Sequence, residues 1–448
     1  MKSIANYSLG ALTQYRPCCW IHASVATTTG VAATASVLNV LPLQRTDLDR
    51  AQARWERLRP TLSALFEQGV ITSPLRQTSD GFRESLGLPP SCTLLVKEDS
   101  KLAVCGSVKA RGGLYETFAF AESVSANEDK TTLLDAIRAG RMRDYSVVVG
   151  STGNLGMSVG MAAAAMGMRS TIHMSKDAKA WKIKLLRERG CDVRVHEGSY
   201  GNAVAQGRRD TDANEMAHFV DDEHSETLFL GYACAAFELR DQMVAMGIDM
   251  QKHIVVHIPC GVGGAPSGIC WGLKHVFGDT VTVLFAEPTH APCVLLALGP
   301  ATRGEEGEAG IMSCADAGLD VLTEADGLAC GKASPLCCTM VADLCGGIYT
   351  VDDESLFTRL AQLVEYEGET AFMEPSCCAA LEGPRHLAWV RDHGSTASEK
   401  EACARMLDGA IHVIWATGGS LVPEEERQRF LERGRKGSRP SAKSSSGV

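Results

Sequence analysis

The sequence has 448 residues, 45% of them hydrophobic and 22% charged, which matches the composition of globular proteins and excludes a disordered, fibrous or collagen-like chain. A chain about three times the length of a typical domain is expected to fold as two domains. The 44 Lys and Arg against 54 Asp and Glu give a net charge of −10, so no general attraction to nucleic acid or anionic lipid is expected.

The first 46 residues contain no Asp or Glu, include Lys2 and Arg16, and are rich in Ser, Thr and Ala. This composition has some likeness to an organelle presequence, so a mitochondrial location is the alternative to a cytoplasmic one. We interpret the segment as a divergent N-terminal extension with little order. Its apolar run, 31–43, is shorter than the ~20 residues of a membrane span, so no transmembrane helix is expected.

Beyond this segment, short β-branched runs alternate with helical patterns. The predicted strands are 145–150, 170–174, 192–195, 253–258, 280–285 and 412–415. The predicted helices are 47–65, 155–168, 177–189, 231–246, 267–277 and 354–367. This alternation indicates an α/β fold with buried parallel strands. Residues 435–448 lack apolar periodicity and are expected to form a flexible, solvated tail.

The 17 cysteines are scattered through apolar segments and include no C-x-x-C spacing. An odd number in this pattern predicts reduced, buried thiols in an intracellular protein. A structural zinc site is not expected.

Glycine-rich segments follow three of the predicted strands, at 150–156, 259–268 and 416–420. Ligands of open α/β sheets bind beyond the carboxyl ends of the strands, so we expect the three segments to converge on one crevice. In the second, Gly261, Gly263 and Gly264 let backbone N–H groups approach an anion at the start of a helix. Pro266 stands where a dinucleotide fingerprint needs glycine, and no Walker lysine is present, so a single terminal phosphate fits better. A turn that holds no ligand is the alternative.

Two further segments offer polar groups. Hydroxyl and amide donors in 151–154 suit a carboxylate or a ring oxygen, with ordinary helix capping as the alternative. Lys109 lies in the small, apolar run 106–113. A lysine there can be desolvated and nucleophilic, although an exposed position at a helix start is the usual one.

Together these segments resemble the bacterial-type D-serine dehydratase family, which belongs to the fold type II pyridoxal-phosphate enzymes. The resemblance runs from about residue 47 to about residue 434. The segment before residue 47 does not resemble the family. At three single positions, Ala265, Ser267 and Ser420, this sequence has another residue where glycine is usual in the family. The passages that carry it are 106–113, 150–156, 173–181, 220–223, 227–232, 285–290, 325–329, 415–419 and 422–426.

The resemblance implies two open, twisted parallel-sheet domains, as in tryptophan synthase β, with pyridoxal 5′-phosphate between them. The large domain would comprise 47–125 and 235–434, and the small domain 126–234. The implied reaction is α,β-elimination of D-serine to pyruvate and ammonia, by a monomer activated by potassium or another monovalent cation. The alternatives are a dehydratase of threonine or hydroxyaspartate, a nicotinamide- or nucleotide-binding protein, and a binding protein that keeps the cofactor without activity.

The resemblance also implies roles for single residues. Lys109 would hold the cofactor covalently and serve as a base, and Asn154 would bond its 3′-oxygen. Thr417 would face the pyridine nitrogen. The phosphate would bind at Gly261, Val262, Gly263, Gly264 and Ala265, and the substrate carboxylate at Ser151, Thr152 and Gly153.

Three more residues are candidates on the same basis. Asp222 and Tyr200 are candidates for a contact to the substrate hydroxyl or for the acid that protonates it. A loop carboxylate and a packing tyrosine are the alternative interpretation of these two residues. Glu287, after the strand at 280–285, is the candidate for the monovalent cation.

Overall fold

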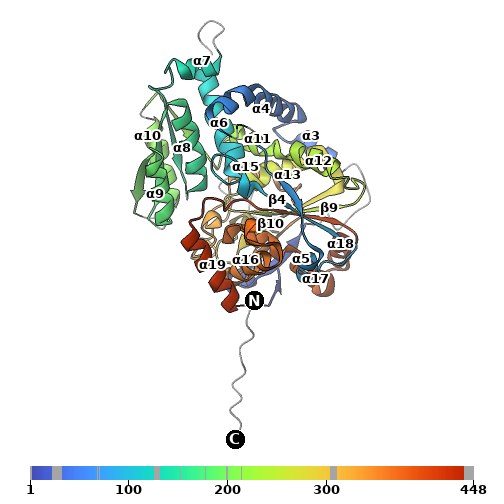
Figure 1. The fold of residues 1–448 in the computed structure, drawn as a ribbon. Helices are drawn as coiled ribbons and strands as arrows, with labels where there is room; N and C mark the ends of the chain where they lie inside the picture. Colours follow the sequence, from blue (N-terminus) through green and yellow to red (C-terminus); the bar gives the residue numbers. More distant parts are fainter. Residues whose placement is uncertain are drawn as a thin grey trace.

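Two sheets organise the chain in the computed structural model, which describes residues 3–22, 33–67, 69, 71–125, 132–151, 153–176, 178–197, 200–212, 214–302 and 310–437. The larger sheet has eight strands in the order β1-β2-β11-β10-β9-β12-β4-β3, and the smaller has four in the order β7-β6-β5-β8. Helices α8, α9 and α10 gather around the small sheet at one side of the molecule (Figure 1). The predicted α/β fold is confirmed.

All six predicted strands are present. The large sheet consists of β1 (Ala5–Asn6), β2 (Cys18–Ile21), β3 (Leu75–Gln77), β4 (Thr93–Lys97), β9 (Ile254–Pro259), β10 (Val281–Pro288), β11 (Gly347–Val351) and β12 (Ile411–Trp415). The small sheet consists of β5 (Ser146–Gly150), β6 (Arg169–Ser175), β7 (Asp192–His196) and β8 (Ala217–Val220). The small sheet is parallel throughout. In the large sheet β2 pairs antiparallel with β11, and β3 with β4.

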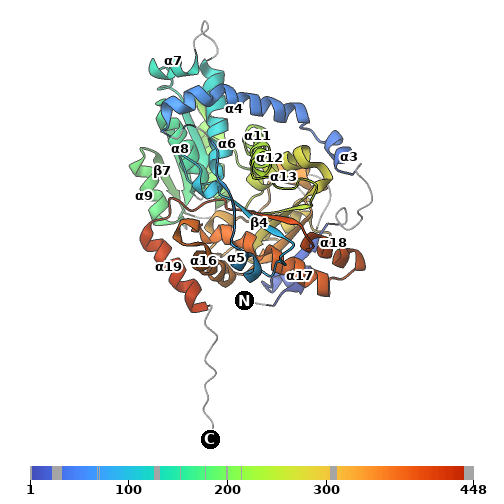
Figure 2. The ribbon, with the colours of Figure 1, turned by 45° about the vertical axis from the view of Figure 1, so that its right-hand side comes forward.

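Helices pack on both sheets, and α4 lies across the top of the molecule over α6 and α11 (Figure 2). The prediction of one helix at 231–246 is divided in the structure, because α11 ends and α12 begins around Cys234. The helices are α1 (Leu9–Thr13), α3 (Ala33–Val40), α4 (Arg45–Leu65), α5 (Asp80–Ser85), α6 (Lys109–Ser125), α7 (Leu133–Arg138), α8 (Asn154–Met166), α9 (Ala180–Glu188), α10 (Tyr200–Asp212), α11 (Glu226–Ala233), α12 (Ala235–Ala245), α13 (Gly264–Phe277), α14 (Cys293–Leu298), α15 (Pro335–Val341), α16 (Asp353–Glu367), α17 (Gly383–His393), α18 (Ala397–Leu407) and α19 (Glu424–Gly437). Shorter 3-10 turns include η1 (Asp99–Lys101), η4 (Asp326–Leu328) and η6 (Pro375–Glu382).

The structure differs from the expectation for the first residues of the chain. Residues 18–21 form β2, and all four are buried between β1 and β11. The run Cys-Cys-Trp-Ile is apolar on both faces, as a strand covered on both sides must be. Because the run is only four residues long and its neighbours are not periodic, the sequence did not distinguish this strand from an unstructured segment.

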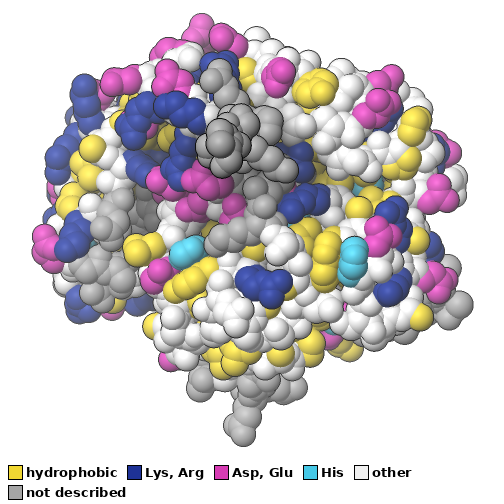
Figure 3. Space-filling model, turned by 90° about the horizontal axis from the view of Figure 1, so that it is seen from below, with side chains coloured by type: hydrophobic (Ala, Val, Ile, Leu, Met, Phe, Trp, Pro, Cys, Tyr) yellow, Lys and Arg dark blue, Asp and Glu magenta, His cyan; other side chains and the backbone are white. Residues whose placement is uncertain are grey.

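The outer surface carries charges of both signs. Seen from below, Lys and Arg side chains lie interspersed with Asp and Glu (Figure 3). Arg433 on α19, for example, donates to Glu324 at 3.1 Å and to Glu354 at 2.6 Å. None of the helices in the described ranges has the length and apolar run that crossing a bilayer requires.

The cysteines are buried, as the sequence predicts. All 17 are free thiols, and Cys338 alone is partly exposed. Burial raises the pKa of the buried thiols, for Cys105 to about 11. They therefore stay protonated at neutral pH and act as small apolar side chains with weak hydrogen-bonding capacity.

A buried ion pair fixes the beginning of α6. Arg111 donates to both oxygens of Asp99 at 2.7 Å and to Glu238 at 2.8 Å. Lys97 at the end of β4 also pairs with Glu238, and the Trp415 indole donates to Asp99 at 2.8 Å. The group thus joins β4, β12, α6 and α12, which are distant in the sequence.

The carboxyls of this group are held in their charged form. Burial alone would raise the pKa of Asp99 and of Glu238, but the Arg111 guanidinium outweighs burial and holds both pKa values below the ordinary ones. A carboxyl whose pKa is lowered by folding stabilises the fold above its unfolded pKa, about 4. That contribution is lost as the pH falls through the lower, folded value.

We predict that Arg111→Met lowers the free energy of unfolding by about 3 kcal/mol at pH 7, because buried carboxylates lose their main partner. The deficit should shrink as the pH falls towards 4, since protonation then removes the unpaired charge. Urea denaturation at several pH values measures both effects.

The matched control is Arg57→Met, which removes an exposed partner of Glu122. Arg57→Met should lower the free energy of unfolding by less than about 0.5 kcal/mol at every pH. An Arg111→Met deficit that is equally small, or that does not change with pH, would contradict the role assigned to the buried group.

Candidate active site

A cavity with an empty volume of about 750 Å³ lies where the loops after β5, β9 and β12 meet the start of α6. All three glycine-rich segments contribute to its wall, so the predicted convergence is confirmed. Its lining consists of Val108, Lys109, Gly150, Ser151, Asn154, Leu155, Asp222, Ile258, Pro259, Gly261, Val262, Gly263, Gly264, Ala265, Pro266, Ile269, Gly327, Leu328, Cys330, Glu374, Ser376 and Thr417.

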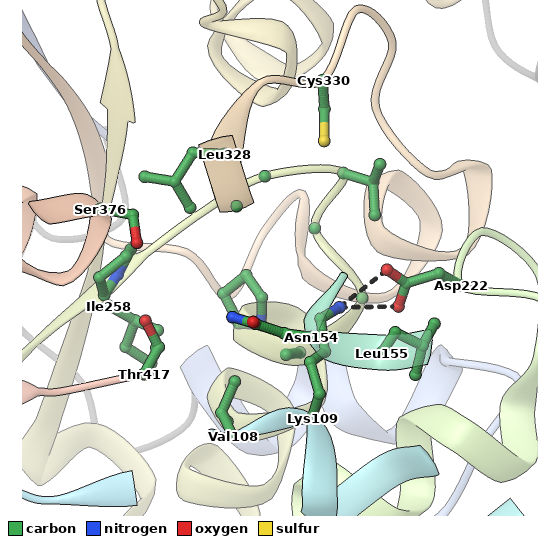
Figure 4. Close-up of a pocket in the computed structure, with 18 of the residues that line it drawn as sticks. Val108, Lys109, Asn154, Leu155, Asp222, Ile258, Leu328, Cys330, Ser376 and Thr417 are labelled. Carbon is green, nitrogen blue, oxygen red and sulfur yellow. Dashed lines mark hydrogen bonds and ion pairs between the residues drawn. The ribbon is translucent and has the colours of Figure 1, made fainter. Parts of the chain in front are cut away.

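Lys109 is the first residue of α6, and its amine faces this cavity rather than the outer surface. Its Nζ donates to the two oxygens of Asp222 at 2.7 and 3.0 Å, as the dashed lines in Figure 4 show. The Lys109 side chain is 20% exposed and that of Asp222 is 9% exposed. The Ser158 hydroxyl donates to the Lys109 carbonyl at 2.8 Å and holds the helix start in place. The structure therefore brings these two predicted residues into direct contact.

The loop after β9 forms a cradle walled by backbone. Gly263 has a φ of 106°, and a Cβ on it would overlap the Cys337 sulfur. A Cβ on Gly264 would lie 2.9 Å from the Asp222 carbonyl oxygen. Because α13 begins at Gly264, the N–H groups of its first turn have no partner within the helix. This positive helix end, free of large side chains, fits a phosphate group.

The residues that replace the family's glycines leave the cradle intact. Ala265 lines the cavity with no more than a methyl group. The buried Ser267 hydroxyl donates to the Gly264 carbonyl at 3.1 Å, inside the helix itself. Neither side chain therefore blocks the cradle.

Some polar groups of the loop after β5 form hydrogen bonds with one another. The Ser151 hydroxyl oxygen accepts hydrogen bonds from the backbone N–H groups of Gly153 and Gly156, both at 2.9 Å. This is the capping role that the sequence left as an alternative, and the hydroxyl keeps its own hydrogen to donate. Thr152 lies outside the described residues.

Asn154 points its amide into the cavity, where Nδ2 donates to Glu374 Oε1 at 3.0 Å. Burial raises the pKa of Glu374, and the nearby ammonium of Lys182 opposes this rise. Lys182, almost fully buried on α9, donates to Asp326 on η4 at 2.9 Å. Two carboxyls and one ammonium thus lie behind the Asn154 amide.

Thr417 follows β12 on the opposite side of the view from Asp222 (Figure 4). Its backbone carbonyl accepts a hydrogen bond from Val108 at 2.8 Å, which links this loop to the residue before Lys109. Its hydroxyl oxygen lies 3.1 Å from the Cys377 sulfur. Thr417 therefore presents a neutral hydroxyl to the cavity.

Four predicted site residues, Thr152, Gly153, Tyr200 and Glu287, are not among the described residues that line the cavity. Tyr200 opens α10, and its side chain is outside what the structure describes. Glu287 is buried at the end of β10, and its two oxygens accept from the N–H groups of Val294 and Leu295 at 2.8 Å. Burial raises the pKa of Glu287 to about 8. Glu287 thus caps α14.

Several lining residues were not predicted. The segment 325–329, which supplies Gly327 and Leu328, carried part of the resemblance but was given no role. Glu374 and Ser376 follow no strand that the sequence predicted. A buried acid in the apolar stretch 371–381 was the available signal. The other lining residues without a predicted role are Val108, Gly150, Leu155, Ile258, Pro259, Pro266, Ile269 and Cys330.

Comparison with known proteins identifies the family. The family described as "Pyridoxal-phosphate dependent enzyme" matches residues 67–396. A protein of Burkholderia pseudomallei (strain 668) named "Probable D-serine dehydratase" is 44% identical over 400 residues, 86% of this chain and 87% of the relative. One of the same name from Shouchella clausii (strain KSM-K16) is 41% identical over 403 residues, again 86% of this chain and 87% of the relative.

Solved structures agree on the fold. Diaminopropionate ammonia lyase from Escherichia coli, in complex with D-serine, is similar with a TM-score of 0.66 and 20% identity, over 86% of this chain and 93% of that one. Threonine deaminase isoform 2 from Solanum lycopersicum has a TM-score of 0.60 and 17% identity, over 88% and 90% of the two chains. The family model over residues 67–396 and the relatives at 41–44% identity show that the chain belongs to the pyridoxal-phosphate-dependent enzymes, and the solved structures agree with the architecture of fold type II.

Proposed function

We propose that this enzyme eliminates water from D-serine to give pyruvate and ammonia. The observation that carries the proposal is the common cavity of the Lys109 amine, the cradle at α13 and the Asn154 amide. The choice of D-serine is supported by the names of the relatives that are 41–44% identical over 86% of the chain. No part of the cavity favours a nucleotide, since only one phosphate-sized cradle is found along its described lining.

Pyridoxal phosphate fits the residues of the cavity. Lys109 would hold it covalently, and the backbone of 261–265 would bind the phosphate. Asn154 would donate to the ring oxygen, and Thr417 would face the ring nitrogen. When bound, this cofactor supplies an electron sink that stabilises the negative charge left at Cα when its proton is removed.

Lys109 and Asp222 would carry out the proton transfers of the reaction. A lysine amine must lose a proton before it can attack a carbonyl, and the Asp222 carboxylate is 2.7 Å from it. The neutral amine of Lys109 can then take the Cα proton. Asp222, carrying a proton, can deliver it to the departing β-hydroxyl, which leaves as water. The 2-aminoacrylate that remains hydrolyses to pyruvate and ammonia.

Binding of the substrate would rely on the loop after β5. The positive end of α8 and the hydroxyl hydrogen of Ser151 are available to a carboxylate. Thr152 and Gly153 are predicted to join them, and the Gly153 N–H would then have to leave the Ser151 oxygen to which it donates in this structure. Tyr200 stays a second candidate for the acid at the substrate hydroxyl. The relative position of carboxylate and acid would then select the D-configuration.

We also propose a monovalent cation, potassium among the candidates, near Glu287. The support is a buried carboxyl that accepts hydrogen bonds from two backbone N–H groups and has no ion pair with a cationic side chain of the described residues. A bound cation would supply a charge partner and so favour the ionised form of this carboxyl, whose pKa burial raises to about 8. Activity measured in potassium against tetramethylammonium tests this proposal.

The enzyme would work as a monomer in the cytoplasm. Seventeen free cysteines support a reducing compartment. Light scattering after size-exclusion chromatography tests the monomer.

The decisive experiment compares pyruvate or 2-oxoacid release from D-serine, L-serine, D-threonine, L-threonine and 3-hydroxyaspartate. We expect the highest kcat/KM with D-serine. A preference for an L-amino acid or for hydroxyaspartate would replace the proposal by the related dehydratase activity. Retention of the yellow cofactor without any product would identify a binding protein.

We predict that Lys109→Ala and Lys109→Arg both lower turnover by several orders of magnitude. The arginine variant keeps the charge beside Asp222 but cannot form the covalent link or act as a base. After borohydride reduction and proteolysis, mass spectrometry should find the cofactor on the peptide containing Lys109. As a control, Lys176→Ala, which changes an exposed lysine, should keep the wild-type turnover and cofactor attachment. Cofactor reduced onto another lysine would contradict the assignment.

We predict that Ala265→Asp weakens cofactor binding at least 100-fold, because a carboxylate would lie beside the phosphate. Two unit charges 4 Å apart repel by about 4 kcal/mol at an effective dielectric constant of 20. Ala265→Asn, similar in size but neutral, should bind much more tightly than Ala265→Asp, and Ala265→Gly should bind at least as tightly as wild type. Fluorescence titration of the apoenzyme measures all three. Equal affinities of the Asp and Asn variants would place the phosphate elsewhere.

A further inference from the structure

Cys377 makes an unusual set of contacts behind the cavity wall. The residue lies on η6 and is fully buried. Its sulfur lies 3.1 Å from the Thr417 hydroxyl oxygen and 3.2 Å from the Gly418 carbonyl oxygen. It also accepts the Gly418 backbone N–H at 3.0 Å. The thiol therefore contacts three polar groups of the 417–418 segment.

The thiol keeps its hydrogen under working conditions. Burial, with a smaller effect of the Glu374 carboxyl, raises the pKa of Cys377 to about 12. A thiol has one hydrogen to donate, and here two oxygens compete for it. The Gly418 carbonyl already accepts the Glu374 backbone N–H at 3.0 Å, whereas Thr417 is the nearer acceptor.

The choice of acceptor decides what Thr417 offers to the cavity. If the thiol donates to Thr417, the hydroxyl hydrogen of Thr417 is free to point into the cavity. If the thiol donates to Gly418, Thr417 donates to the sulfur, and only its oxygen lone pair faces the cavity. The first arrangement binds a ring nitrogen without a proton, and the second binds a protonated one.

We propose that Cys377 is a positioning residue whose thiol donates to Thr417 and makes the Thr417 hydroxyl a donor towards an unprotonated pyridine nitrogen of the cofactor. The proposal rests on the proposed function in one respect, that Thr417 faces the ring nitrogen. An unprotonated ring is a weaker electron sink than a protonated one. Cys377 thereby favours rapid elimination over transamination.

The experiment uses holoenzyme loaded with pyridoxal phosphate labelled with ¹⁵N in the ring. The nitrogen chemical shift, recorded without substrate over a range of pH, reports the protonated fraction directly. The samples are wild type, Cys377→Ala, Cys377→Ser and Thr417→Val. Cys378→Ala is the matched control, because that buried thiol donates to a backbone carbonyl, that of Glu374 at 3.9 Å, and not to Thr417.

We expect an unprotonated nitrogen in wild type and in Cys378→Ala. In Cys377→Ala the protonated fraction should rise several-fold at a given pH, as loss of one directing hydrogen bond predicts. Cys377→Ser should restore the wild-type signal, since a hydroxyl can donate in the same way. Turnover assays should show more pyridoxamine phosphate per pyruvate in Cys377→Ala alone among the cysteine variants.

Three results would overturn the inference: a protonated nitrogen in wild type, an unchanged signal in Cys377→Ala, or a change in Cys378→Ala as large as in Cys377→Ala. An unchanged signal in Thr417→Val would also overturn it and would trace the failure to the orientation of the cofactor. Because no substrate is used, a wrong substrate assignment leaves the nitrogen measurement valid. Failure of wild type to retain the cofactor would instead refute the proposed function and the inference together.

Discussion

The geometry of the cavity depends on one buried guanidinium. Arg111 lies two residues after Lys109 and is enclosed by Asp99 and Glu238. A planar group with five donors can serve two carboxylates at once, which an ammonium does less well. Because those carboxylates come from separate elements, the first turn of α6 has a single position relative to both β4 and α12. Because Lys109 is the first residue of α6, the position of its amine is fixed by the same contacts.

Parallel strands provide the second constraint. The carboxyl ends of β5, β9 and β12 open onto the same cavity, although β5 belongs to the small sheet and the other two to the large one. Close packing of the loops requires glycine, as at Gly418, where a Cβ would overlap the Glu374 carboxyl. The ion pair of the buried Lys182 with the partly exposed Asp326 joins the two sides, since α9 packs with the small sheet and η4 belongs to the segment between β10 and β11.

Charge is distributed unevenly around the cavity. Ionisable pairs, Lys109 with Asp222 and Lys182 with Asp326, lie near the loop after β5 and the start of α6. At the other side the Thr417 hydroxyl and the Cys377 thiol are neutral, and the Glu374 carboxyl beside them has a pKa that burial raises. Proton transfer to the substrate and a moderated electron sink at the cofactor ring are therefore compatible within one cavity, which is the combination that an elimination requires.

The sequence by itself determined the α/β class, six strands, the three glycine-rich loops and Lys109, because these depend on local periodicity and on backbone conformations that glycine permits. It did not reveal β2, β4 or β11, whose short apolar runs become strands only when neighbouring strands cover them. Glu374 and Cys377 were missed for the same reason. Their partners, Asn154 and Thr417, are 220 and 40 residues away in the sequence, so only tertiary packing could show which polar atoms meet.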